Sequence, residues 1–314
     1  MRYFDLQVNG YAGIDFNGAS LSTEDAHRAC AALKEDGTEE ILATVITDGL
    51  EAMKGKLRRI VKAREEDDLV REVIVGIHIE GPFLNGAEGY VGAHPRDCVM
   101  PASVDGMKEL LEAAGGLTKI VTLAPECDAG MKTTAFLAGE RIVVSAGHCD
   151  PSRDELRAGI EAGLTMFTHL GNGCPAQLHR HDNIVERVLS LADDLWVCFI
   201  GDGVHVPAFA LRNYLRAAGP ERCIVVTDAI SAARAGPGRY TLARWELEIG
   251  EDLVARAPDG SHFVGSTATM PVVERVLREE VGLGGDDVRG LTWERPRAAL
   301  GWDPSSPDGG KITN

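Results

Sequence analysis

Short runs of apolar and β-branched residues alternate with helical stretches along most of this 314-residue chain. The predicted strands cover residues 3–8, 40–46, 72–79, 118–124, 141–146, 165–168, 195–200 and 223–227. The predicted helices lie between most of them, at residues 23–36, 51–64, 104–113, 152–162, 185–192 and 207–218. Such alternation is typical of βαβ units that form a parallel sheet. Eight strands of this kind predict an α/β fold that closes into a (β/α)8 TIM barrel.

The chain length fits one such barrel, which takes ~250 residues and can exceed ~400 with insertions. Residues 229–265 interrupt the alternation, and residues 244–249 within them alternate between polar and apolar. This pattern predicts a β-hairpin insertion after the last barrel strand, before a closing helix that starts at Pro271. We expect one catalytic domain over residues 1–303 and a loosely ordered tail over 304–314. The alternative, a doubly wound open sheet, lacks a GxGxxG motif between a strand and a helix.

Charge and cysteine usage restrict the partners and the compartment. The net charge of -16 argues against nucleic-acid binding, which depends on lysine and arginine, but still permits a small anionic substrate. Seven scattered cysteines without a CxxC pair predict reduced thiols and a cytoplasmic protein. No signal-peptide pattern or bilayer-length apolar run is present, so we expect no membrane association.

Side chains that can bind a metal or a proton follow five of the predicted strands at their carboxyl ends. They are Glu80, His148, His169, His205 and Asp228. In a TIM barrel these ends form the face on which active sites are built. A single buried histidine is more often a hydrogen-bonded core residue, and a carboxylate at a strand end often caps the next helix. Recurrence at the same end of several strands favours a functional site.

Glu80, His148 and His169 form a ligand set that suits one divalent cation. One carboxylate and two imidazoles favour Zn²⁺, with Fe, Co and Mn as alternatives, and leave positions open for water and substrate. A cation in such a set can activate water for hydrolysis, and Asp228 is then the candidate general base. His78 shares a strand face with Glu80, and we expect it to support the site rather than to bind the cation.

Short motifs in a fixed order make the chain resemble a known family. They occupy residues 5–10, 78–84, 92–95, 147–148, 168–170, 202–205, 226–229, 265–267 and 296–298. Each motif is weak alone, but their order and spacing resemble the N-acetylglucosamine-6-phosphate deacetylases of the amidohydrolase superfamily. The resemblance extends from Asp5 to about Gly301.

The resemblance implies a metal-dependent hydrolase that removes the acetyl group from N-acetylglucosamine-6-phosphate and works as a homodimer. It implies metal ligands at Glu80, His148 and His169, an acid/base at Asp228, and substrate contacts at His94, Asn172, Gly173 and His205. Many amidohydrolases carry an HxH pair for a second metal where this chain has Gln7 and Asn9, which favours a single metal. These two amides either hydrogen-bond at the barrel mouth or contact the substrate.

The chain also departs from the family pattern. The family's small β-sandwich, built from both chain ends, is not expected here. Residues 169–174 read His-Leu-Gly-Asn-Gly-Cys where the family has His-Leu-Phe-Asn-Ala-Met. The segment 177–182 has an apparent insertion, and there the family's phosphate-binding arginine corresponds to Arg180 or is replaced by His181. Two alternatives therefore stay open: the same chemistry on another N-acyl or cyclic amide, and a catalytically inactive sugar-phosphate binding protein.

Overall fold

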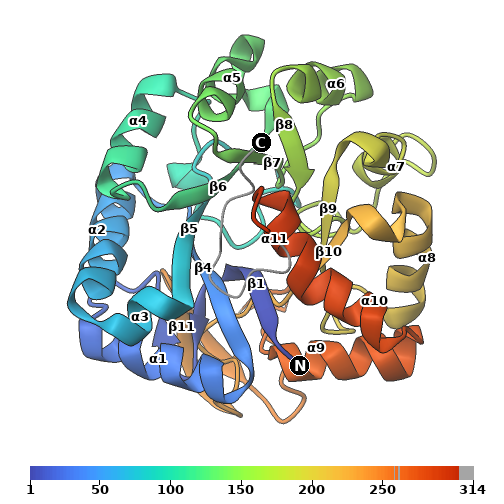
Figure 1. The fold of residues 1–314 in the computed structure, drawn as a ribbon. Helices are drawn as coiled ribbons and strands as arrows, with labels where there is room; N and C mark the ends of the chain where they lie inside the picture. Colours follow the sequence, from blue (N-terminus) through green and yellow to red (C-terminus); the bar gives the residue numbers. More distant parts are fainter. Residues whose placement is uncertain (258, 261, 304–314) are drawn as a thin grey trace.

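Eight parallel strands form a nearly closed barrel at the centre of the computed structural model, which describes residues 1–257, 259–260 and 262–303 (Figure 1). The strands follow one another around the barrel in chain order as β1 Tyr3–Val8, β4 Thr38–Ile46, β5 Ile74–Glu80, β6 Thr118–Leu123, β7 Val143–Ala146, β8 Leu164–Phe167, β9 Trp196–Ile200 and β10 Cys223–Val226. The predicted TIM barrel is therefore confirmed. The predicted tail, residues 304–314, lies outside the described residues.

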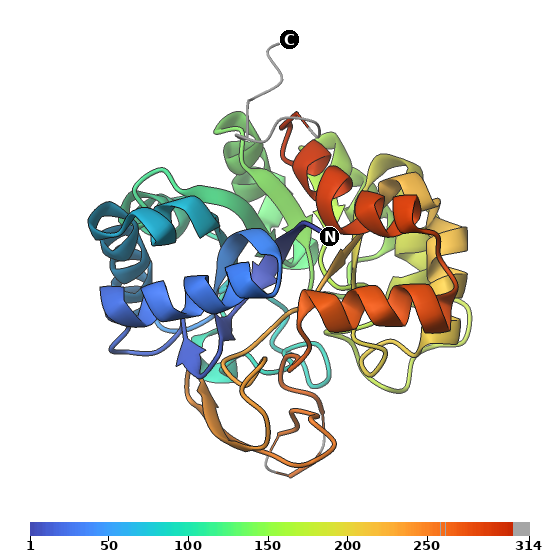
Figure 2. The same ribbon diagram turned by 60° about the horizontal axis from the view of Figure 1, so that its bottom comes forward.

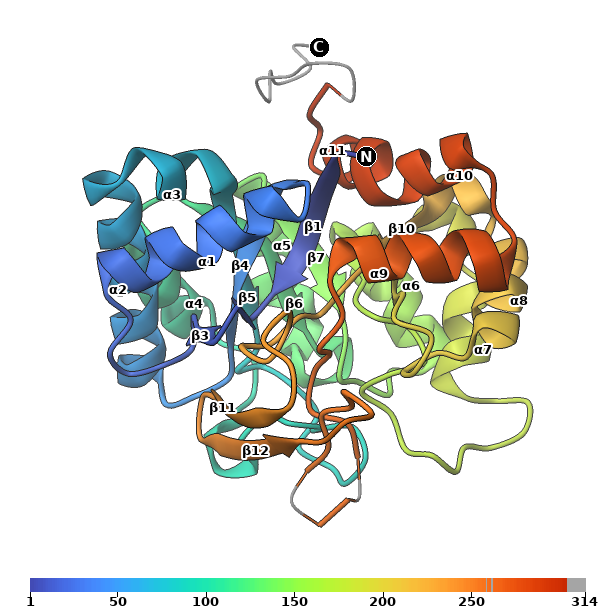
Figure 3. The ribbon, with the colours of Figure 1, turned by 90° about the horizontal axis from the view of Figure 1, so that it is seen from below.

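The first and last strands meet through individual contacts rather than a regular ladder. The backbone N–H groups of Asn9 and Gly10 donate to the carbonyl oxygen of Ala229 at 2.7 and 3.2 Å. The backbone N–H and the hydroxyl of Thr227 both donate to the buried carboxylate of Asp5. Helices α1 and α9 flank β1 on its two sides in Figures 2 and 3. Early and late parts of the chain thus close the barrel together.

Helices cover the outside of the barrel, mostly where the sequence predicts them. They are α1 Thr23–Glu35, α2 Leu50–Glu66, α3 Asp68–Val73, α4 Val104–Ala113, α5 Lys132–Gly139, α6 Arg153–Glu161, α7 Ile184–Leu189, α8 Ala208–Ala218, α9 Met270–Arg275, α10 Gly285–Arg289 and α11 Arg295–Ala299. Ser22 and Ser152 start α1 and α6 through capping boxes, in which serine and the N3 carboxylate satisfy free N–H groups. The sequence patterns did not predict α3, α5, α10 and α11. Within the described ranges, no helix combines the length and apolar character that crossing a bilayer requires.

Aromatic side chains fill the end of the barrel where the strands begin. The ring of Trp302 stacks on Phe4 with centroids 5.5 Å apart. The guanidinium of the fully buried Arg297 lies 4.8 Å from the ring of Trp293 and 5.7 Å from that of Trp302. Helix α11, which carries Arg297, lies over this end beside the N-terminus (Figure 3). The strands end at the opposite mouth, which is the face where active sites of such barrels lie.

The predicted hairpin lies at that opposite mouth (Figures 2 and 3). Its antiparallel strands are β11 Gly238–Leu242 and β12 Trp245–Ile249, and a shorter pair, β2 Gly10–Tyr11 and β3 Ile14–Asp15, follows β1. Leu242, Leu247 and Ile249 of the hairpin belong to an apolar cluster separate from the main core. The indole Nε1 of Trp245 donates to the carbonyl oxygen of Ala93 at 2.6 Å. The insertion therefore braces the loop that carries His94.

Candidate metal centre

The three predicted metal ligands meet at the mouth of the barrel. One ligand atom from each of Glu80, His148 and His169 lies within 4.8 Å of the others, and none of the residues is more than 7% exposed. Nε2 of His169 lies 3.1 Å from both Glu80 Oε1 and His148 Nε2. His148 Nε2 lies 3.4 Å from the same oxygen. Two imidazole nitrogens and a carboxylate oxygen thus converge from three different strands.

The contact behind His148 prepares its ring for a cation. Its Nδ1 lies 2.8 Å from the carbonyl oxygen of Tyr90. A carbonyl oxygen can only accept, so Nδ1 carries the proton and Nε2 presents its lone pair to the cluster. Metal-binding histidines commonly donate their other ring N–H to a carbonyl in this way. The set of two imidazoles and one carboxylate therefore fits a divalent cation of the zinc type.

Two glycines leave room for the His148 ring. A Cβ at Gly173 would lie 2.9 Å from Nδ1 of this ring, and a Cβ at Gly92 would lie 3.1 Å from its Cε1. Both glycines have positive φ angles, 62° and 56°, which residues other than glycine rarely adopt. The predicted role of Gly173 as a backbone contact is thus accompanied by a steric one.

We expect Gly173→Ala to displace the His148 ring and to weaken Zn²⁺ binding by about 10- to 100-fold, the usual effect of losing a ligand's support. The added methyl group would press on the ring, and the backbone of the new alanine would be strained at this positive φ. Competition with a chromophoric chelator measures the affinity. Gly116→Ala is the matched control, because Gly116 has a φ of 79° and a Cβ there would meet no atom of the described residues within 4 Å. Equal zinc affinities in the two variants would contradict the contact.

The backbone marks three residues of the site independently of their ligand chemistry. His148, His169 and Asp228 have φ values of 52°, 34° and 54°, and each stands two residues past the end of its strand. Residues other than glycine seldom adopt this left-handed region, because their Cβ crowds the backbone. Such conformations persist where the surrounding structure enforces them, and they cluster at functional sites.

Two amides at the end of β1 hold the carboxylates of the site. Gln7 Nε2 lies 3.3 Å from both carboxylate oxygens of Glu80. Asn9 Nδ2 donates to Asp228 Oδ1 at 2.8 Å. Of the two roles that the sequence left open for Gln7 and Asn9, hydrogen bonding at the barrel mouth is the one observed.

The two carboxylates differ in their protonation. Burial by itself would raise the pKa of Glu80, but its close contacts with the imidazoles of His148 and His169 outweigh burial and hold that pKa well below the ordinary value. Burial, aided by the charge of Glu80, raises the pKa of Asp228 to about 6. Glu80 therefore stays anionic and can bind a cation. Asp228 titrates near neutrality, where a general base works best.

His94 reaches the same cluster with the support of Thr47, a residue that the sequence patterns did not single out. Nδ1 of His94 lies 3.3 Å from the backbone N of Thr47 and 2.9 Å from its hydroxyl. Burial lowers the pKa of His94 to about 3, so the ring is neutral. Because a backbone N–H can only donate, Nδ1 accepts and Nε2 carries the ring proton, 3.2 Å from His148 Nε2. The available signal was that Thr47 directly follows β4.

His78 lies in a polar layer next to Glu80, in the supporting position that the sequence favoured. Its Nε2 contacts the hydroxyl of Thr122 at 2.7 Å, and Thr122 contacts the hydroxyl of Thr168 at 2.8 Å. The hydroxyls of Ser145 and Thr168 lie 2.6 Å apart. Both nitrogens of His78 are used within the barrel, since Nδ1 lies 3.2 Å from the carbonyl oxygen of Leu6.

The remaining predicted substrate residues divide into two groups. Asn172 lies beside His169, to whose carbonyl oxygen its backbone donates, and its buried Nδ2 has no partner among the described residues. His205 lies in the turn after β9, where its Nδ1 is 2.6 Å from the carboxylate of Asp202. Arg180 and His181 instead lie exposed in the loop before α7, and no side-chain contact joins either of them to the cluster in the part of the chain that the structure describes.

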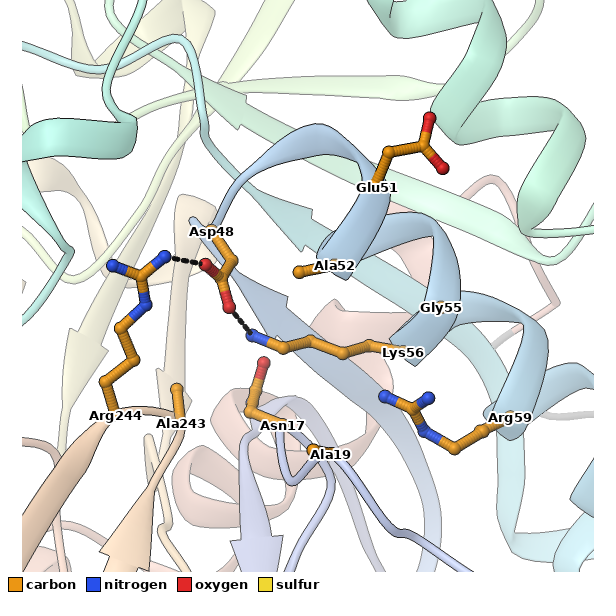
Figure 4. Close-up of a pocket in the computed structure, with 10 residues that line it drawn as sticks. All are labelled: Asn17, Ala19, Asp48, Glu51, Ala52, Gly55, Lys56, Arg59, Ala243 and Arg244. Atoms are coloured by element: carbon orange, nitrogen blue, oxygen red, sulfur yellow. Dashed lines mark hydrogen bonds and ion pairs between the residues drawn. The ribbon is translucent and has the colours of Figure 1, made fainter.

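A cavity of about 340 Å³ lies along the first turns of α2 (Figure 4). Its charged lining includes Asp48, Lys56 and Arg244. The carboxylate of Asp48 pairs with Lys56 Nζ at 3.0 Å and also with Arg244. The ion pairs in this cavity are formed within the protein, so we assign it no part in the chemistry.

Comparisons with known proteins identify relatives of the whole barrel. No family model matches the chain. An N-acetylglucosamine-6-phosphate deacetylase from Bacillus subtilis is 33% identical over 300 residues, which are 95% of this chain and 74% of the relative. An N-acetylgalactosamine-6-phosphate deacetylase from Escherichia coli O157:H7 is 27% identical over 304 residues, 96% of this chain and 78% of that protein. The solved structure of the Mycobacterium smegmatis N-acetyl-D-glucosamine-6-phosphate deacetylase with N-acetyl-D-glucosamine-6-phosphate has a TM-score of 0.85 and 29% identity, covering 96% of this chain and 77% of that one.

Proposed function

The chain belongs to the N-acetylglucosamine-6-phosphate deacetylase family, and from this premise we propose that it hydrolyses N-acetylglucosamine-6-phosphate to glucosamine-6-phosphate and acetate. The observation that carries the proposal is the convergence of Glu80, His148 and His169 on one point, within 4.8 Å of one another. Asp228 and His94 stand around the same cluster. We propose that residues 1–303, including the insertion at 229–265, act as one catalytic domain.

Glu80, His148 and His169 would hold one divalent cation, which we propose to be Zn²⁺. When bound, such a cation lowers the pKa of a coordinated water towards ~7 and polarises the substrate carbonyl. The donor set matches the two imidazoles and one carboxylate of known catalytic zinc sites. The negative charge of Glu80, the Nε2 lone pair of His148 and the burial of all three residues support this assignment.

The surrounding residues would move the protons. Asp228, with its pKa raised to about 6, accepts the proton of the attacking water and returns it to the leaving amine. Asn9 keeps this carboxylate in place by donating to Oδ1. The Nε2–H of the neutral His94 is available to the acyl oxygen as negative charge develops there.

The sugar and its phosphate would be bound at the rim of the cluster. We propose that the Nδ2 of Asn172, which has no partner among the described residues, and the backbone of Gly173 bind the sugar. His205 would bind the phosphate. We propose a homodimer, because the exposed Arg180 is available to a phosphate held by a second copy. We also propose that the enzyme acts in the cytoplasm, where all seven cysteines, which are free in the structure, would stay reduced.

The Zn²⁺-loaded protein is expected to release acetate and a free amine from N-acetylglucosamine-6-phosphate. The kcat/KM for unphosphorylated N-acetylglucosamine is expected to be lower by about 100-fold or more, because the phosphate contributes binding energy to the transition state. Assays of acetate and primary amine measure both. N-Acetylgalactosamine-6-phosphate, the substrate in the name of one relative, tests the sugar epimer. Equal rates with and without phosphate would contradict phosphate recognition, and no turnover of any of the three would contradict the proposed reaction.

A further inference from the structure

The turn after β9 contains a buried carboxylate that the proposed reaction does not use. This residue, Asp202, stands two residues past the end of the strand, in the same position that His148, His169 and Asp228 hold on theirs. Its side chain is 6% exposed. A buried carboxylate in this position on the functional face of a barrel needs a reason, because an ionised carboxylate is costly to bury without partners.

Four hydrogen bonds converge on the carboxylate of Asp202. The backbone N–H groups of Val204 and His205 each donate to Oδ1 at 2.8 Å. Oδ2 lies 2.6 Å from Nδ1 of His205 and accepts from the hydroxyl of Ser266 at 2.9 Å. Burial alone would raise the pKa of Asp202, but the bonds with His205 outweigh it and keep that pKa below its ordinary value. The donors around the carboxylate therefore favour the ionised form of Asp202.

An anionic acceptor on one side of the ring decides which atom His205 offers on the other. Because the carboxylate has no proton to give, Nδ1 of His205 carries the hydrogen, and Nε2 faces away from Asp202. The ring of Phe263 packs against the imidazole with centroids 4.9 Å apart and planes at 58°. His205 is therefore held from two directions, with one nitrogen left for a ligand.

We propose that Asp202 is a positioning residue for phosphate recognition: it fixes the ring of His205 so that Nε2 meets the phosphate of the substrate. This inference rests on the proposed function, since it concerns the same substrate. Asp202 also supplies the negative counter-charge that an imidazolium in contact with a phosphate needs inside a buried site. Ser266 links this turn to the reacting centre, because its hydroxyl donates to Asp202 and its backbone N–H donates to the carbonyl oxygen of Asp228 at 3.0 Å.

The test is the phosphate preference of Asp202→Asn, defined as the ratio of kcat/KM for N-acetylglucosamine-6-phosphate to that for N-acetylglucosamine. The amide keeps the shape of the side chain but loses its charge. We expect the ratio to fall by about 10- to 100-fold, mainly through a higher KM for the phosphorylated substrate. Asp193→Asn, an exposed charge removal just before β9, should leave the ratio unchanged.

The variant His205→Asn and the double variant, together with Asp202→Asn and the parent, form a double-mutant cycle. If Asp202 acts through His205, the second substitution adds little to the first, and the effects on the ratio are far from additive. An equal loss of both activities in Asp202→Asn would mean a merely structural role and would overturn the proposal, as would an unchanged ratio. If the parent shows no phosphate preference, it is the proposed function that fails.

A spectroscopic readout is independent of turnover and of the folding of any variant. The ¹⁵N shifts of the His205 ring in the parent protein report which nitrogen carries the proton. Nδ1 protonation is expected, and a ring protonated only at Nε2 would overturn the proposal.

Discussion

Asp228→Asn is expected to lower kcat by about 10³-fold while Zn²⁺ stays bound, because general acid–base catalysis contributes roughly 10²- to 10⁴-fold. The amide has the same shape, and its oxygen can still accept the hydrogen bond from Asn9 Nδ2 that now holds Oδ1. It cannot take up a proton at any pH of interest. Steady-state assays with N-acetylglucosamine-6-phosphate, together with metal analysis of the same preparation, measure the two effects separately.

Asp48→Asn is the matched control for this substitution. Asp48 is also buried, also follows a barrel strand and lies near the same mouth, but it pairs with Lys56 and Arg244 in the neighbouring cavity. Its kcat should remain close to that of the parent, even if the melting temperature falls. Hydrolysis by Asp228→Asn at the parental rate would refute the assignment of the base.

Removal of the cation is expected to abolish hydrolysis and to lower the thermal stability. Two imidazoles and a carboxylate share one point in a buried site, and without a cation their lone pairs repel one another. A ligand present at about 1,000 times its Kd stabilises the folded state by about 4 kcal/mol, so the melting temperature should fall on dialysis against a chelator. Zn²⁺ should restore both properties. Mg²⁺, which prefers oxygen ligands, should not.

The affinity of the metal-free protein for Zn²⁺ is expected to fall as the pH is lowered. Burial by itself would lower the pKa of His169, but the hydrogen bond with Glu80 outweighs it and raises that pKa above its ordinary value. Below this pKa a proton must leave before the cation binds, so affinity falls by about tenfold per pH unit for each displaced proton. Titrations at several pH values measure the slope. Full activity in protein shown to be free of metal, or affinity that rises on acidification, would contradict this account.

The barrel strands could be predicted closely because their signal is local. Each is a short apolar run, and the predicted β1 matches the observed bounds. The patterns missed α5 because two of its buried positions, Thr133 and Thr134, are polar residue types that break the apolar periodicity. They missed α3 because it has only six residues directly after α2. The prediction of the next strand therefore began too early, at residue 72 rather than at Ile74.

The candidate site could be predicted only as far as strand ends reveal it. Glu80 ends its strand and the other three residues, His148, His169 and Asp228, follow theirs, and a barrel brings all such positions to one face. Their supports come from elsewhere in the chain: the carbonyl oxygen of Tyr90 is an atom that every residue has, so no residue type signals it. The steric role of Gly173 depends on the position of a ring 25 residues away in the chain. Contacts of this kind appear only once the loops are placed.

The insertion at residues 229–265 supports loops that we propose to contact the substrate, whereas the candidate metal ligands lie on the barrel. The three candidate metal ligands are mounted on the barrel, whereas the loop with His94 is braced by Trp245, and the ring of His205 by Phe263. Both supports come from one contiguous stretch of chain. A variant with a new acyl or sugar preference can therefore be sought by diversifying that stretch alone, while the three metal ligands keep their places on the barrel.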